Sequence, residues 1–220
     1  MNVTDGIGCT YQTTVAVVQP TPLAVSATVT NVSCSGGSDG TLSSTPSGGT
    51  PSYTYAWLPG GQTTSSITGQ PAGVYTVQVT DSKGCVITAS YTVTQPTPLA
   101  TVPTSTNVNC FGGSNGAANV VVSGGTPSYT YSWNPTGGSS GSASGLPVGT
   151  YTLLVTDSKG CIITQTVAIT EPTVLTATMA FTNETCDYSN NGTASVSVSG
   201  GTPVYTYSWQ PGGQTSSSIS

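Results

Sequence analysis

The stretch GGTPSYTYSW, residues 124–133, occurs three times in this chain with small changes. GGTPSYTYAW occupies residues 48–57 and GGTPVYTYSW residues 200–209, so each copy follows the previous one by 76 positions. In every copy two tyrosines and a tryptophan alternate with other residues, which is the period-2 pattern of a strand with one buried face. We predict that these aromatic side chains pack in the core of a β-domain. The set is Tyr53, Tyr55, Trp57, Tyr129, Tyr131, Trp133, Tyr205, Tyr207 and Trp209.

The 76-residue period extends over the whole chain, which is the signature of a tandem-repeat architecture. Residues 23–98 and 99–174 align without a gap and are predicted to be two complete repeats. Residues 1–22 correspond to the C-terminal part of a repeat, and residues 175–220 to the N-terminal part of one. Because Met1 aligns with the middle of a predicted strand, we expect the chain to be a segment of a longer array.

Each complete repeat is predicted to contain six strands. In the first repeat they cover residues 23–33, 41–46, 52–58, 62–67, 74–80 and 85–94, separated by turn sequences such as SGGSDG, SGGTP, PGG and DSKG. Short strands at this spacing are typical of a β-sandwich. We therefore predict an all-β chain of tandem sandwiches, with the six strands running alternately up and down. The proline-rich QPTP segment is predicted to be a stiff linker.

The composition excludes several classes of function. Charged residues make up 4% of the chain, Lys83 and Lys159 are the basic residues, and the formal net charge is −5. Nucleic acids and anionic membranes are therefore not expected partners, because their binders need Lys and Arg. Membrane insertion is not expected either, since no apolar run approaches about 18 residues. Histidine is absent, so the chain has no histidine general base and no Ser/His/Asp set, and we predict that the protein is not an enzyme.

Several motifs together resemble a known family. GGTPSYTYSW at 124–133, GLPVGTYTLLVTDSKGC at 145–161 and ITEP at 169–172 look like the SprB repeat of very long surface proteins in gliding and related Bacteroidota. The segment GTYTLLVTDSKG is also similar to PKD domains, which are Ig-like sandwiches. The resemblance implies tandem Ig-like or PKD-like sandwiches, secretion by the type IX system, an extracellular position on the cell surface, and roles in adhesion and gliding motility.

Six cysteines form two periodic series, Cys9, Cys85, Cys161 and Cys34, Cys110, Cys186. The CxxC spacing of a zinc site is missing, so we interpret them as disulfide cysteines of an oxidising compartment. Bonds within repeats compete with Cys9–Cys34 and Cys85–Cys110 bonds between repeats. The up-and-down order places Cys34 and Cys85 at one end of the domain and favours Cys34–Cys85 and Cys110–Cys161, with Cys9 and Cys186 paired outside the chain.

Two binding hypotheses are less favoured. Calcium is a weak possibility at the turn residues Asp39, Asn115, Asn191, Asp5, Asp81 and Asp157, which we place at one end of the domain, but one or two carboxylates per repeat are few for this ion. We therefore expect no cofactor. The aromatic strand could instead stack on surface polysaccharide.

Together these patterns predict a structural segment of a repetitive, secreted cell-surface filament or stalk that serves adhesion and possible gliding. Its expected partners are neighbouring repeats of the same chain or identical chains. A carbohydrate-binding adhesin module and a pilus-like subunit that polymerises by strand exchange remain alternatives.

Overall fold

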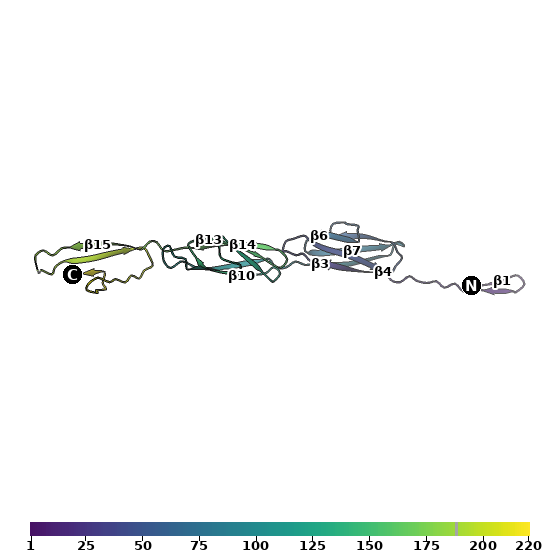
Figure 1. Cartoon of the computed structure of the whole chain (residues 1–220). Helices are drawn as coiled ribbons and strands as arrows, with labels where there is room; N and C mark the ends of the chain where they lie inside the picture. The colour runs from purple at the N-terminus through teal and green to yellow at the C-terminus, as the bar shows by residue number, and fades with distance from the viewer. Residues whose placement is uncertain (188) are drawn as a thin grey trace. The chain divides into compact units, whose positions relative to one another are not determined.

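The computed structural model describes residues 1–187 and 189–220, and over these ranges the chain consists of β-strands, turns and irregular segments (Figure 1). Among the described residues there is no helix that is long and apolar enough to cross a membrane. The chain divides into two compact units, Met1–Pro96 and Thr97–Ser220.

The first unit contains a short hairpin and one complete repeat. The hairpin pairs β1 (Asn2–Thr4) with β2 (Thr10–Gln12). The repeat contains β3 (Ala24–Thr30), β4 (Gly40–Ser47), β5 (Tyr53–Leu58), β6 (Ser66–Gln70), β7 (Gly73–Asp81) and β8 (Val86–Val93). All six strands match the predicted ranges to within a few residues.

The second unit repeats this pattern with the 76-residue period. Its complete repeat contains β9 (Ala100–Thr106), β10 (Gly116–Ser123), β11 (Thr130–Asn134), β12 (Ser142–Leu146), β13 (Gly149–Thr156) and β14 (Ile162–Ile169). A third copy then begins with β15 (Thr176–Thr182), β16 (Thr193–Ser199) and β17 (Ser218–Ile219). The start of β3 at 24, of β9 at 100 and of β15 at 176 shows the constant spacing.

The strand order identifies the fold class. Strands β3, β4 and β6 form one antiparallel sheet in that order, and β5, β7 and β8 form a second. The order β9, β10, β12 and the order β11, β13, β14 reproduce it in the second unit. Immunoglobulin domains place strands A, B and E in one sheet and C, F and G in the other. With the six strands taken as A, B, C, E, F and G, each complete repeat is an Ig-like sandwich that lacks strand D, and the predicted fold class is confirmed.

The two sheets enclose a continuous apolar core in each complete repeat. In β7, Tyr75, Val77 and Val79 are buried while the residues between them face outward, as the period-2 pattern requires. They pack with Leu42 of the facing sheet and with Trp57, both of which are fully buried. The equivalent strand β13 contributes buried residues to the equivalent cluster of the second repeat.

Two features of the core match known positions in immunoglobulin domains. The buried Trp57 lies on the strand equivalent to C, where such domains carry a core tryptophan. Tyr75 lies at the start of the strand equivalent to F, and its hydroxyl donates to the Pro71 carbonyl oxygen at 2.9 Å. Tyr151 donates to the Pro147 oxygen at 3.0 Å in the second repeat. This is the geometry of a tyrosine corner.

The predicted up-and-down order is wrong. Strand β6 pairs with β4 and not with β5. After β5, residues 59–65 cross to the other sheet and run back along the domain, so that β6 runs in the same direction as β5. As a result, β3 and β8 both run toward the same end. Val32, just after β3, donates its N–H to the Thr94 oxygen at 3.0 Å, and Thr94, just after β8, donates to Asn31 Oδ1 at 2.9 Å.

Each complete repeat therefore has a proximal end, where the chain enters, and a distal end, where it leaves. In the first repeat the proximal end carries Thr21, the 48–50 loop and the 81–85 turn, and the N–H of Gly49 donates to the Thr21 oxygen at 2.8 Å. The distal end carries residues 31–40 and 94–95. A chain that enters at one end and leaves at the other can be extended by simple repetition.

Candidate functional site

The turn between β7 and β8 is held by one buried carboxylate at the proximal end. Asp81 Oδ1 accepts the N–H groups of Lys83 and Cys85 at 2.9 and 2.8 Å, and Oδ2 accepts the N–H of Thr50 at 2.8 Å. Asp81 is 5% exposed. Its carboxylate thus joins the 81–85 turn to the GGT part of the repeated ten-residue motif.

The second repeat contains the same arrangement. Asp157 accepts from Lys159 and Cys161 at 2.8 and 2.9 Å, and from Thr126 at 2.8 Å. Hydrogen bonds to the charged form hold the pKa of both aspartates below the ordinary value, with the Thr50 or Thr126 N–H as the largest cause and burial opposing it.

The glycines of the motif are required by close approach at the same end. Gly48 has a φ of +68°, and a Cβ there would overlap the carbonyl oxygen of Pro22. Gly124 has a φ of +72°, and a Cβ there would overlap the carbonyl oxygen of Pro98. The hydroxyl of Tyr53 donates to the Gly48 oxygen at 2.7 Å, so the first tyrosine of the motif closes the loop that its glycines begin.

The distal end is organised around the loop that carries the second cysteine series. Asp39 Oδ1 accepts the N–H of Ser33 at 2.9 Å, and hydrogen bonds from Ser33 lower the pKa of Asp39. Gln95, the first residue of the QPTP linker, accepts the N–H of Gly36 at 2.8 Å. In the second repeat Glu171 accepts the N–H of Gly112 at 2.6 Å. The linker is therefore attached to the cysteine loop by its first side chain.

The calcium hypothesis placed both turn series at one end of the domain, and this is wrong. Asp39 lies at the distal end and Asp81 at the proximal end, because β7 and β8 run opposite to the predicted directions. Within the described part of the chain, no group of three or more acidic, cysteine or histidine side chains could hold a metal ion.

The predicted disulfides Cys34–Cys85 and Cys110–Cys161 are also wrong. Cys34 and Cys161 are disulfide-bonded, but Cys85 and Cys110 are free, as are Cys9 and Cys186. The reason is again strand direction. Cys85 directly precedes the eight-residue strand β8, and the Cys34 loop lies beyond its far end. Such a strand is about 26 Å long, whereas a disulfide needs Cα atoms within about 7 Å.

The aromatic residues of the motif lie in or against the core of the complete repeats. Trp57 is 0% and Trp133 6% exposed, and their indole N–H groups donate to the oxygens of Thr64 and Ser140 at 3.0 and 2.9 Å. The tyrosines of these two copies are half-buried against the same cores: Tyr53, Tyr55, Tyr129 and Tyr131. Neither tryptophan presents a face on which a sugar could stack.

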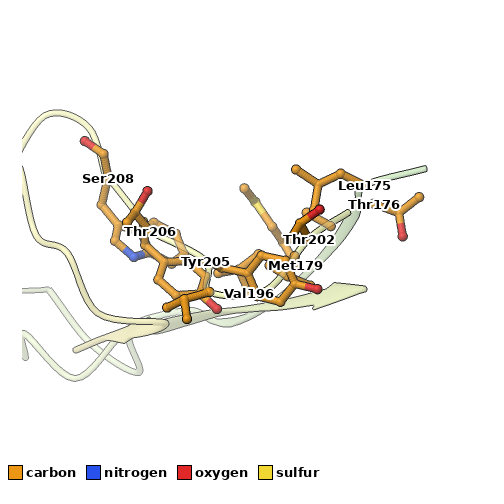
Figure 2. A pocket seen from close by; sticks show the side chains of 13 residues that line it. Leu175, Thr176, Met179, Val196, Thr202, Tyr205, Thr206 and Ser208 are labelled. Carbon is orange, nitrogen blue, oxygen red and sulfur yellow. The ribbon is translucent and has the colours of Figure 1, made fainter. Parts of the chain in front are cut away.

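The third copy of the motif lines an open hollow of about 560 Å³ (Figure 2). Tyr205, Tyr207 and Trp209 are half-buried there, with Met179 and Val196 from β15 and β16. Val196 is equivalent to Val120, which the second sheet buries in the complete repeat. The hollow thus corresponds to the inner face of one sheet of the sandwich, and it is lined by the apolar and aromatic side chains that form the core in a complete repeat.

Sequence analysis recognised the VTDSKGC element as a turn but missed the role of its aspartate. The exact recurrence of Asp81 and Asp157 four residues before a cysteine was the available signal. The attachment of Gln95 and Glu171 to the cysteine loops had no comparable signal, because a polar residue before a proline is common in linkers.

The strand order and the repeated end structures define a class of protein, a tandem array of Ig-like sandwiches. The SprB repeat family matches residues 26–62, 102–138 and 178–214, at the same 76-residue spacing. These segments cover half of the chain, and the chain belongs to the SprB repeat family.

No curated protein matches the chain. Among solved structures, a crystal structure of Dpr2 Ig1-Ig2 in complex with DIP-Theta Ig1-Ig3 is similar, with 12% identity and a TM-score of 0.29, covering 79% of this chain and 76% of that one. The fold assignment rests on the strand order and the tyrosine corner instead.

Proposed function

We propose that this chain is a structural segment of a long, repetitive protein that is secreted and displayed as a filament or stalk on a bacterial cell surface. The observation that carries the proposal is the path of the chain through each complete repeat. It enters at the proximal end and leaves at the distal end, so every added copy adds length.

The composition supports a structural rather than an enzymatic role. The repeated residues of the motif form turns and pack in the core, and the carboxylates of Asp81 and Asp157 accept hydrogen bonds from backbone N–H groups. Few charges on a Ser- and Thr-rich chain allow close lateral contact with other surfaces, because little charge repulsion opposes it.

We also propose that the array serves adhesion. Many weak contacts along an array act together, since each bound copy raises the effective concentration of the next. Membership of the SprB repeat family supports adhesion, gliding motility and export by the type IX system as the setting of this array. Neighbouring repeats and identical chains are its proposed partners.

Immunogold electron microscopy tests the display of the chain. Antibodies raised against residues 1–220 should label intact producing cells outside the envelope. Label that appears only after the cells are permeabilised would overturn the proposal. A strain in which residues 23–98, one exact period, are deleted is the matched control. The deletion keeps the register of the array, so the antibody should still label the surface of these cells.

Attachment of cells to glass tests adhesion separately. Cells that lack the whole protein should attach and spread less than cells with the one-period deletion. Equal attachment of the null strain and the parent would refute adhesion while leaving surface display intact.

A further inference from the structure

The first and last strands of each complete repeat run in the same direction and are in contact. Strand β3 begins at the proximal end and β8 finishes at the distal end, and the Tyr91 hydroxyl of β8 donates to the Val25 oxygen of β3 at 3.3 Å. In the second repeat, the Thr101 hydroxyl of β9 donates to Gln165 Oε1 of β14 at 2.9 Å. Tension on the chain therefore pulls the first strand backward and the last strand forward, each along its own axis.

Both strands resist such a pull through whole ladders of hydrogen bonds. All seven residues of β3 pair with β4, and all eight residues of β8 pair with β7. Because the bonds of an antiparallel ladder are perpendicular to the strands, a pull along a strand loads every bond of its ladder at the same time. A pull across the strands would break the bonds one after another from an end. Tension between the points of entry and exit thus acts in the direction that each ladder resists best.

Hydrogen bonds also join the end of the first strand directly to the end of the last strand. The N–H of Val32 donates to the Thr94 oxygen at 3.0 Å, and the N–H of Thr94 donates to Asn31 Oδ1 at 2.9 Å. Val32 is buried, so the first of these bonds lies at the edge of the core. We call Asn31, Val32 and Thr94 the distal tie. Tension moves Thr94 away from the other two residues, so it stretches both bonds of the tie.

The second repeat contains the same distal tie. The N–H of Val108 donates to the Thr170 oxygen at 2.9 Å, and the N–H of Thr170 donates to Asn107 Oδ1 at 3.0 Å. Val108 is buried like Val32. The asparagine of the tie therefore recurs with the 76-residue period, and Asn183 occupies the same position in the third copy.

We propose that each complete repeat carries tension, and that its distal tie passes the force from the first strand to the last. Residues between these two strands are then unloaded until the tie and the ladders break. This inference deepens the proposed structural role, but it concerns a property of single repeats. A measurement on the isolated chain does not depend on where cells place the protein, so surface display and resistance to tension can fail separately.

Single-molecule force spectroscopy on the full chain tests the proposal. The chain is held through handles at its two ends and is kept reduced, so that no disulfide limits its extension. Each complete repeat should unfold in one abrupt step of about 22 nm, which is the extended length of residues 24–93 less the height of the folded repeat. Gradual lengthening at low force, without two such steps, would overturn the proposal.

Asn31→Ala tests the distal tie itself. The substitution removes the acceptor of one hydrogen bond, so the first repeat should unfold under force about fivefold faster. The second repeat of the same molecule should keep the parent rate and is an internal reference. Asn31→Asp keeps an acceptor oxygen and should restore the parent rate. An unchanged rate in Asn31→Ala would show that the tie carries no tension.

Tyr75→Phe is the matched control. It also removes one hydrogen bond near the distal end of the first repeat, but the bond from Tyr75 to Pro71 lies outside the path from β3 to β8. Urea unfolding should show similar losses of stability for Asn31→Ala and Tyr75→Phe, whereas unfolding under force should become faster only in Asn31→Ala. Equal acceleration of both variants under force would reduce Asn31 to an ordinary stabilising residue and overturn the tie.

Discussion

At the scale of single residues, the contacts made by the GGT part of the repeated motif explain why this sequence recurs. The first glycine lets the backbone approach the preceding linker, and the threonine N–H reaches the buried aspartate of the β7–β8 turn. Both contacts are made by the backbone, and at the first glycine a Cβ would overlap the carbonyl oxygen of the linker. The motif thus has two roles: its GGT part builds the proximal end of the repeat, and its aromatic part forms a core strand.

Gly48→Ala tests this close approach. Alanine at a left-handed φ costs about 1–2 kcal/mol by itself, and the overlap with the Pro22 oxygen adds to that. Gly84→Ala is the matched control, because Gly84 has a φ of +85° with open space around its Cβ position. Urea unfolding of both variants should show the larger loss for Gly48→Ala, and equal losses would contradict the overlap.

Acid should destabilise the repeats through the turn aspartates. The pKa of Asp81 and of Asp157 is lower in the folded state, so their stabilising effect is full above the ordinary value near 4 and is lost as the pH falls through the lowered pKa. The double variant Asp81→Asn/Asp157→Asn should be less stable at pH 7 and should lose less stability between pH 5 and pH 2. Thermal unfolding measured across this range checks both, and an unchanged acid slope in the double variant would count against the aspartates.

At the scale of elements, the motif tryptophan has two environments in one chain. Trp57 is enclosed by both sheets, whereas Trp209 is half-exposed over the hollow of the third copy. Trp57→Ala should cost about 3–5 kcal/mol, as for other buried tryptophans. Trp209→Ala should cost clearly less. Denaturant unfolding followed by far-UV circular dichroism measures both, and similar losses would mean that Trp57 is not the centre of its core.

The elements also show what could be predicted from the sequence. Alternation in β5 and β7 is a local property, so strand positions and inward-facing residues followed from it. Strand direction is not local. It depends on how residues 59–65 cross between sheets, and no periodic pattern marks a crossing segment. That single error reversed β7 and β8, and with them the predicted disulfides and the shared end of the turn residues.

At the scale of the whole molecule, both lysines occupy the same position in successive repeats. Lys83 and Lys159 lie in the β7–β8 turn, where their N–H groups donate to Asp81 and Asp157 at 2.9 and 2.8 Å. Cleavage at either lysine requires the turn to open, and the rate then follows the population of the open form. Each lysine therefore reports on the stability of its own unit.

We expect trypsin to cleave the native chain far more slowly than the chain unfolded in urea, at a urea concentration at which trypsin remains active. Loss of one turn carboxylate should be local: Asp81→Asn should speed cleavage at Lys83 and leave cleavage at Lys159 unchanged, and Asp157→Asn should do the reverse. Samples are quenched and reduced at each time point, and mass spectrometry then follows the fragments 1–83 and 160–220 separately. If either substitution accelerated both cleavages equally, the two units would open together, and the picture of repeats that each close their own proximal turn would fail.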